Sequence, residues 1–154
     1  MKIRKKYMLL PAYLVGLLLS AFVHATGMTV ESLEKIGVKP MSTAQIKALI
    51  VGNIIVVRNT DTLANYAARF DANGKRVLQK VAALKDGPKI IYQTLGDAKD
   101  ANVATYEIKN NRMTTQFEGK TFEVLIFKIK DTYYAARSSD NGDVNWELVL
   151  VTKQ

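Results

Sequence analysis

The sequence predicts a mainly β domain, an antiparallel meander of about eight or nine strands that closes into a small up-and-down barrel. Beyond residue 53, short apolar runs alternate with polar residues and are separated by turn residues. The links between these runs hold only about two to seven residues, too short for crossover helices, and therefore favour antiparallel neighbours. An open meander would leave two exposed sheet edges, which closure removes. A β-sandwich is the alternative architecture.

A helical segment, residues 26–52, precedes the strands and is expected to form one domain with the barrel over residues 53–154. A short helix is predicted at 29–36, with acidic residues near its start and a glycine after its end. A second helix begins after Ser42, because Ser42 and Gln45 can satisfy each other's backbone amide groups in a capping box. Its apolar residues recur at helical spacing: Ile46, Leu49 and Ile50. We expect this face to cover an open end of the barrel.

Turn residues divide the rest of the chain into strands. Asn and Gly tolerate positive φ and mark tight turns at 71–74, 110–111 and 140–143, while a longer loop is expected over 96–102. In the last strand, four apolar residues are expected to share one face: Val144, Trp146, Leu148 and Leu150. The predicted strands cover residues 54–57, 63–70, 76–84, 89–95, 103–109, 112–117, 121–129, 132–138 and 144–151.

The N-terminus has the pattern of an export signal. Four basic and no acidic residues occupy the first six positions, and an almost wholly apolar run follows to Val23. The segment Val23-His24-Ala25 then places small residues at the positions that a signal peptidase reads. We therefore expect residues 1–25 to be a cleavable signal peptide, cut after Ala25, and the protein to be exported to the periplasm or the medium without a stable membrane anchor. An uncleaved anchor is the alternative, which Pro11 disfavours.

Cleavage would change the charge and the chemistry of the chain. It removes four of the 22 basic residues and none of the 14 acidic residues, so the formal net charge falls from +8 to +4. It also removes His24, the only histidine, and the sequence has no cysteine. The exported chain would thus lack histidine and cysteine as zinc ligands, a cysteine nucleophile, and the histidine base that a serine or threonine nucleophile usually needs.

The predicted interior of the barrel is the candidate site. Aromatic residues and alanines share the apolar phase of several strands, and a barrel of about eight strands is either filled by side chains or holds one small ligand. Small residues beside tyrosines would leave room for a ligand and offer it polar groups. A packed core is the alternative. The expected ligand-binding residues are Tyr66, Phe70, Tyr106, Phe117 and Trp146.

Catalytic, metal and cofactor sites are not expected. The segment 140–143 resembles half of a calcium loop but lacks the later acids and the closing glutamate. Glycosidase chemistry needs two carboxylates across a cleft. However, the mid-strand acids Glu107, Glu123 and Glu147 are opposite in phase to their apolar neighbours, which predicts that they face solvent.

Nucleic-acid binding is not expected either. Such proteins gather lysines and arginines beside exposed aromatic residues, whereas the basic residues beyond the signal are spread along the strands. The densest pair, Lys75-Arg76, is expected to be a solvated hairpin end.

The segment that leads into the first strand resembles a segment found in other proteins. Residues 42–53 read Ser-Thr-Ala-Gln-Ile-Lys-Ala-Leu-Ile-Val-Gly-Asn. This capped helix and Gly-Asn step, followed by a meander, resemble small exported bacterial domains of uncharacterised function with a lipocalin-like sheet. Lipocalins themselves carry Gly-x-Trp near the first strand, where this chain has Gly52-Asn53-Ile54. The resemblance therefore implies a fold rather than a particular ligand.

Together these patterns predict an exported, non-enzymatic binding protein that holds a small apolar or amphipathic ligand in a lipocalin-like barrel. The alternative is a secreted protein-interaction module, such as an inhibitor or a host-facing factor, that binds a protein partner through loops or a sheet edge. A hydrolase that uses carboxylates is the third possibility.

Overall fold

A computed structural model of the chain describes residues 27–84, 87–94, 103–117 and 119–153. The predicted signal peptide (1–25), its cleavage site Ala25 and the predicted loop over 96–102 lie outside the described residues. In the part of the chain that the structure does describe, no helix combines the length and the apolar character needed to span a membrane.

The order of elements follows the sequence-based prediction closely, with strand limits shifted by a few residues. Two short helices, α2 (Val30–Lys35) and α3 (Thr43–Ile50), come first, and a 3₁₀ turn, η2 (Ser138–Asp140), comes before the last strand. The strands are β1 (Asn53–Asn59), β2 (Asn65–Phe70), β3 (Lys75–Leu84), β4 (Gly87–Thr94), β5 (Val103–Lys109), β6 (Arg112–Phe117), β7 (Lys120–Ile129), β8 (Thr132–Arg137) and β9 (Trp146–Lys153).

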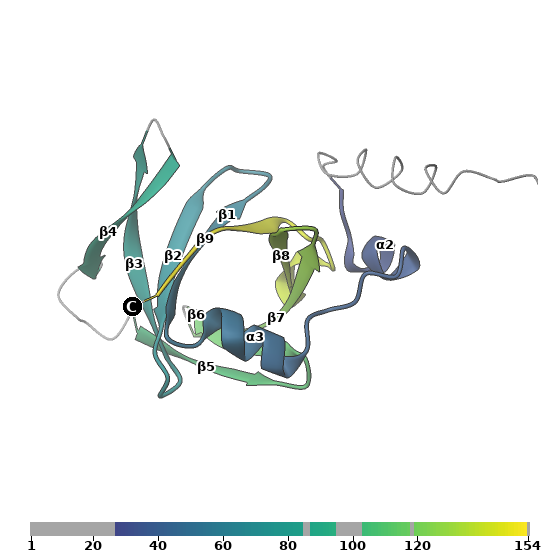
Figure 1. Ribbon diagram of the computed structural model, residues 1–154, viewed down its shortest axis with the longest axis horizontal. Coiled ribbons are helices and arrows are strands. Elements are labelled where there is room, and N and C mark those ends of the chain that lie inside the picture. Colours follow the sequence, from purple (N-terminus) through teal and green to yellow (C-terminus); the bar gives the residue numbers. More distant parts are fainter. Residues whose placement is uncertain (1–26, 85–86, 95–102, 118, 154) are drawn as a thin grey trace, which may run out of the picture.

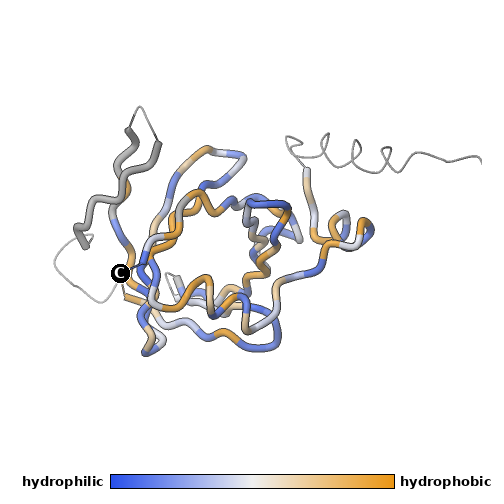
Figure 2. The backbone as a smooth tube through the Cα atoms, in the orientation of Figure 1, coloured by the Kyte–Doolittle hydropathy of each residue, from blue (hydrophilic) through white to orange (hydrophobic). Residues whose placement is uncertain are grey.

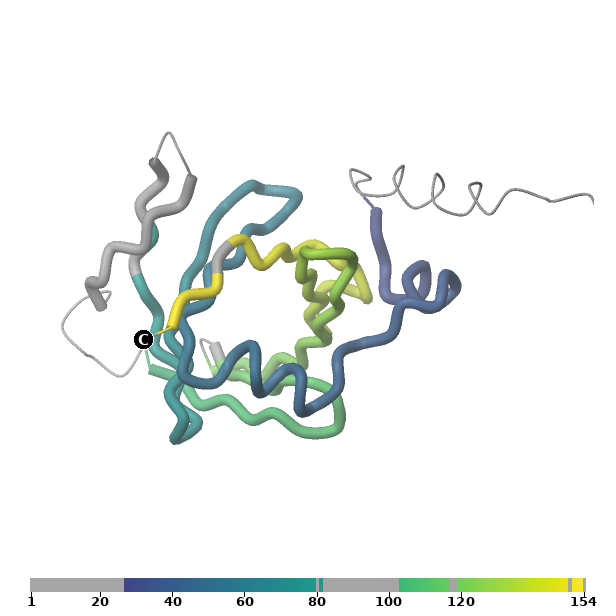
Figure 3. Tube along the Cα trace, viewed as in Figure 1, coloured from purple at the N-terminus to yellow at the C-terminus, as the bar shows by residue number. Residues whose placement is uncertain are grey.

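Eight of these strands form a closed antiparallel barrel, which confirms the predicted fold class (Figure 1). Neighbours around the ring are β1, β2, β3, β5, β6, β7, β8 and β9, and β9 pairs with β1 to close it. Figure 3 shows this closure as the C-terminal strand lying against the N-terminal strand. Closure gives the backbone groups of both terminal strands partners that an open sheet would lack.

Strand β4 lies outside the ring. The start of β3 pairs with β5 through Lys75, Arg76 and Val77, whereas its remainder, from Gln79 to Leu84, pairs with β4. The hairpin of β3 and β4 therefore extends beyond the barrel (Figure 1). The chain is thus an eight-stranded barrel with one additional strand.

Most of the buried apolar residues fall into two clusters, one on each side of the barrel wall. Figure 2 shows hydrophobic stretches all around the ring rather than on one side. The inner cluster comprises Met41, Ile46, Ile50, Ile55, Ala68, Phe70, Ile108, Met113, Val124, Ile126, Ala135, Trp146 and Leu148. The outer cluster comprises Leu33, Phe127, Ala136 and Val144.

Helix α3 contributes to the inner cluster, as the sequence predicts. The Ser42 amide donates to Gln45 Oε1 at 2.8 Å and the Gln45 amide donates to Ser42 Oγ at 3.3 Å, so the predicted capping box is present. Ile46 and Ile50 are fully buried. The Thr43 amide donates to Asn111 Oδ1 at 2.9 Å and thereby ties the helix to the turn between β5 and β6.

The segment around α2 covers the outer cluster. One residue of this cluster, Val144, does not lie where the sequence predicts. Val144 lies in this cluster with Phe127, whereas Trp146 and Leu148 lie in the inner cluster. The physical reason is that β9 begins only at Trp146. Val144 precedes it, and its amide donates to the Met28 carbonyl at 2.8 Å. The expected common face over 144–150 is therefore wrong at its first residue.

Candidate functional site

A cavity of about 290 Å³ occupies the barrel interior. It extends from Ile50, at the end of α3, to Tyr66 and Trp146 near the opposite end of the ring. Tyr66 is 52% exposed, so the cavity meets solvent at this second end, which we call the mouth. The aliphatic residues of the wall include Ile55, Val57, Leu78, Val124, Ile126 and Leu148. A cavity of this size with an apolar wall is close to the lower end of ligand sites in proteins, about 300–1,000 Å³.

Three of the five predicted ligand-binding residues line this cavity: Tyr66, Phe70 and Trp146. Tyr106 stands behind Phe70, with the two rings edge to face and their centroids 5.1 Å apart. The side chain of Phe117 is not among those that the structure describes. A further phenylalanine, Phe122, also lies on the cavity wall, whereas Phe127 of the same strand lies in the outer cluster.

The Tyr106 hydroxyl is held away from the ligand space. It donates a 2.7 Å hydrogen bond to the Asp71 carbonyl oxygen in the turn between β2 and β3. Burial, and to a lesser extent the charge of Asp71, raises the pKa of Tyr106 above its ordinary value. Tyr106 thus braces Phe70 and the turn, rather than offering its hydroxyl to the cavity.

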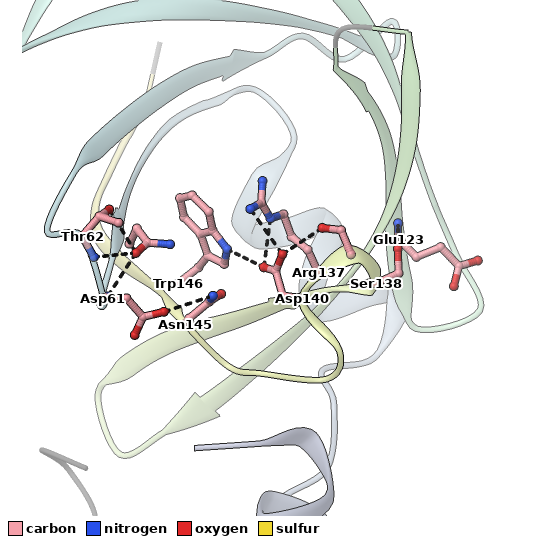
Figure 4. A network of polar contacts seen from close by, with 10 residues as sticks. Asp61, Thr62, Glu123, Arg137, Ser138, Asp140, Asn145 and Trp146 are labelled. Carbon is pink, nitrogen blue, oxygen red and sulfur yellow. Dashed lines mark hydrogen bonds and ion pairs between the residues drawn. The ribbon is translucent and has the colours of Figure 1, made fainter. Parts of the chain in front are cut away.

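At the mouth, Trp146 and Arg137 share one carboxylate, that of Asp140 (Figure 4). The indole N–H of Trp146 donates to Asp140 Oδ2 at 3.0 Å, and Arg137 Nε donates to the same oxygen at 3.1 Å. The Arg137 guanidinium also lies 4.2 Å from the Trp146 ring centroid and 5.6 Å from that of Phe122. These contacts fix the orientation of both cavity-lining side chains.

The local sequence explains why Asp140 reaches both partners. The turn η2 brings Asp140 back towards Arg137, three residues earlier, and the left-handed backbone of Asn141 and Gly142 then reverses the chain into β9. Burial alone would raise the pKa of Asp140. The hydrogen bonds from Trp146, Arg137 and Ser139 and the charge of Arg137 outweigh this effect, and the pKa is lowered. Asp140 is therefore ionised at neutral pH.

The neighbouring rim of the mouth is built by the loop between β1 and β2. Asn59 is buried, and its Oδ1 accepts hydrogen bonds from the amides of Asp61 and Thr62 at 3.0 and 2.8 Å. Asn145 Nδ2 donates to Asp61 at 3.4 Å and joins this loop to the start of β9 (Figure 4). The ring of Tyr66 meets Trp146 edge to face at 5.5 Å. The two rims are thus connected.

Two arginines of the wall were missed by sequence reasoning. The prediction that Lys75-Arg76 is a solvated hairpin end is wrong for Arg76, which is half-buried and lines the cavity. Its Nη2 donates to the Gln116 carbonyl at 2.8 Å, and burial lowers its pKa. The position of each arginine on its strand could have revealed this. Arg76 is two residues before Leu78 and Arg137 is two residues after Ala135, so each shares the face of a residue that points into the barrel.

The acidic residues considered for catalysis lie elsewhere. Glu107 and Glu123 have exposed side chains and form ion pairs with Lys109 and Arg112 at 2.8 and 2.6 Å. Over the described ranges, no three acidic or histidine side chains are grouped so that they could hold a metal ion. Asp140, the first residue of the calcium-like segment, is engaged by Trp146 and Arg137.

The fold and the cavity together define a class: a small closed antiparallel β-barrel with a ligand-sized internal cavity, helix α3 at one end and an aromatic mouth at the other. Comparisons with protein-family models, with curated proteins and with solved structures find no match for this chain.

Proposed function

We propose that this protein is an exported, lipocalin-like binding protein that holds a small apolar or amphipathic ligand inside its barrel. The observation that carries the proposal is the cavity of about 290 Å³ among aliphatic and aromatic side chains. A protein interior is normally packed to the density of organic crystals, with few voids larger than a water molecule. An apolar space of this size that reaches solvent is therefore unusual for a core and suited to a ligand.

The chemistry of the wall agrees with this proposal. Ala68 and Ala135 line the cavity, and their small side chains leave space that a leucine would occupy. Trp146 and Tyr66 present ring faces and edges at the mouth, where an entering ligand would first make contact. The export step rests on the sequence pattern of residues 1–25.

Native mass spectrometry of protein purified from the periplasm or the medium tests this function, because a retained ligand adds mass to the folded chain. The same sample gives the processed N-terminus, for which we expect residue 26. Binding of N-phenyl-1-naphthylamine, a neutral apolar dye, supplies a second readout. We expect saturable binding of one dye molecule per barrel.

A matched pair of variants locates that binding. Ala135→Leu fills part of the cavity and should abolish dye binding, whereas Ala72→Leu adds the same atoms at an exposed turn and should leave it intact. Equal dye binding by both variants would contradict the proposal.

A protein-interaction module is the second candidate, and one observation favours it. Leu63 is 67% exposed and holds a left-handed φ of 59°, which is unfavourable for leucine, and the exposed Tyr66 follows on the same hairpin. A photo-crosslinking residue at position 63 tests this candidate in the producing cell. A discrete adduct with another protein would support it, and the absence of any protein adduct would argue against it.

A further inference from the structure

We infer that the ligand carries an acidic group on its apolar body, and that the guanidinium groups of Arg76 and Arg137 receive this group. The inference rests on the proposed binding function and specifies the chemical class of the ligand. A carboxylate is the simplest such group, because the planar fork of a guanidinium matches its two oxygens.

The two arginines approach the cavity from opposite walls. Arg76 lies on β3 and Arg137 on β8, and these strands are four steps apart around the ring of eight. No acidic side chain is found among the described residues that line the cavity. An anion held between the two walls would thus meet a cationic group on each side.

Arg137 is prepared for such a contact. Its Nε and Nη2 are engaged by Asp140 at 3.1 and 3.4 Å, and its plane is held against the Trp146 ring. In the part of the chain described, its Nη1 makes no hydrogen bond, so two N–H donors remain for a ligand. Because Asp140 and Trp146 already restrict the side chain, little rotamer entropy would be lost when the ligand binds.

Arg76 adds a second cation in a less solvated place. Its Nη2 donates to the Gln116 carbonyl, a neutral group, and the rest of its surroundings include the aliphatic wall around Leu78. Burial penalises its charged form and lowers its pKa, although arginine remains protonated at neutral pH. An anionic group of the ligand within reach of this guanidinium would interact with it strongly, because the wall around it includes aliphatic side chains.

The remaining polar groups of the wall are two hydroxyl groups. That of Thr115 donates to the Thr105 carbonyl at 3.5 Å, and that of Tyr66 can donate to a ligand. A ligand whose polar end only accepts hydrogen bonds therefore fits this wall, whereas an ammonium group would face two like charges. The chemistry of the wall thus distinguishes between an acid, an alcohol and an amine of the same chain length.

Three decyl probes test the inference: decanoate, decan-1-ol and decyltrimethylammonium. Trp146 is the only tryptophan of the chain and lines the cavity, so its fluorescence reports binding of each probe directly. We expect decanoate to bind about tenfold or more tightly than decan-1-ol at neutral pH, as for hydrogen bonds to a charged group. The ammonium probe should bind more weakly than the alcohol.

Variants assign the preference to the two arginines. Arg76→Gln and Arg137→Gln should each lower decanoate affinity towards that of decan-1-ol, with little change in decan-1-ol affinity. Arg112→Gln, on the exposed outer face and paired with Glu123, is the matched control and should bind decanoate as the parent chain does. If loss of the Asp140 contact prevents Arg137→Gln from folding, Arg76→Gln alone decides the outcome.

The possible results separate the acidic-ligand inference from the binding function on which it rests. Equal affinity for decanoate and decan-1-ol, or a decanoate preference that survives Arg76→Gln, would overturn the acidic-ligand inference and leave the binding function standing. Failure of all three probes and of the neutral dye to bind would overturn both.

Discussion

The inner and outer clusters are built from adjacent residues of the same strands, yet they fill their space differently. On β8, Ala135 belongs to the inner cluster and Ala136 to the outer one, and on β7 the same division separates Ile126 from Phe127. Phe127 is fully buried beneath the segment around α2, whereas the inner cluster borders a cavity of about 290 Å³. Alternation along a strand thus decides the side of the wall, and the covering segment decides whether that side is filled.

The largest difference should appear when a phenylalanine is removed from each side of β7. Phe127→Ala should cost about 3–5 kcal/mol of unfolding free energy, because it leaves a void in a closed cluster. Phe122→Ala should cost less, because Phe122 is only half-buried and already borders the cavity. Urea unfolding measures both. Equal losses would show that the two sides are packed alike.

Leucine substitutions at the two alanines of β8 compare the two clusters in the opposite way, by adding atoms instead of removing them. Ala136→Leu should lower the unfolding free energy by about 1–3 kcal/mol, because the outer cluster has no room for three more carbon atoms. Ala135→Leu should be nearly neutral, because its side chain can extend into the cavity. Thermal unfolding of both variants checks this order, and a larger loss for Ala135→Leu would contradict it.

The carboxylate at the mouth should make stability depend on acid pH. The folded-state pKa of Asp140 is lowered, so its contribution is present above the unfolded-state pKa and is lost as pH falls through the folded value. Asp140→Asn should therefore lose about 1–3 kcal/mol at pH 7, where a hydrogen-bonded charge pair is removed, and less at pH 3. Unfolding at the two pH values measures this. An equal loss at both would mean that the ionised carboxylate contributes nothing.

The smallest effects concern the caps of the two covering helices. Ser42→Ala and Thr29→Ala each remove a side-chain oxygen that accepts an N-terminal amide of α3 or α2, at a cost of about 1 kcal/mol. Only Ser42→Ala should also change dye affinity, because α3 borders the cavity through Ile50 and α2 covers the outer cluster. Fluorescence titration of both variants would show a shift in dye affinity for Thr29→Ala if this division were wrong.

Much of the fold could be predicted because its signals are local. The capping box at Ser42, the left-handed turn at Asn110-Asn111 and the strand alternation depend on residues close in sequence, and the structure contains all three. The position of β4 could not be predicted in this way. It depends on β3 changing its neighbour from β5 to β4 along its length, and such pairing is set by contacts between residues distant in sequence.

The site could be predicted only in part for a related reason. Aromatic residues on an apolar phase indicate an interior, and Tyr66, Phe70 and Trp146 do line the cavity. An arginine is ordinarily expected to face solvent. The sequence therefore did not indicate Arg137, although it is two residues after Ala135 and shares the inward face of the strand. Its inward position depends on Asp140, which only the folded turn brings within hydrogen-bonding distance.

Methyl NMR of selectively labelled alanines tests the central claim most directly, because Ala135 and Ala136 report the two sides of one strand. Titration with the neutral dye should shift the Ala135 methyl signal, and that of Ala68, while the Ala136 signal stays in place. Shifts at Ala136 with none at Ala135, or no saturable shift at any of the three, would contradict a ligand site inside the barrel.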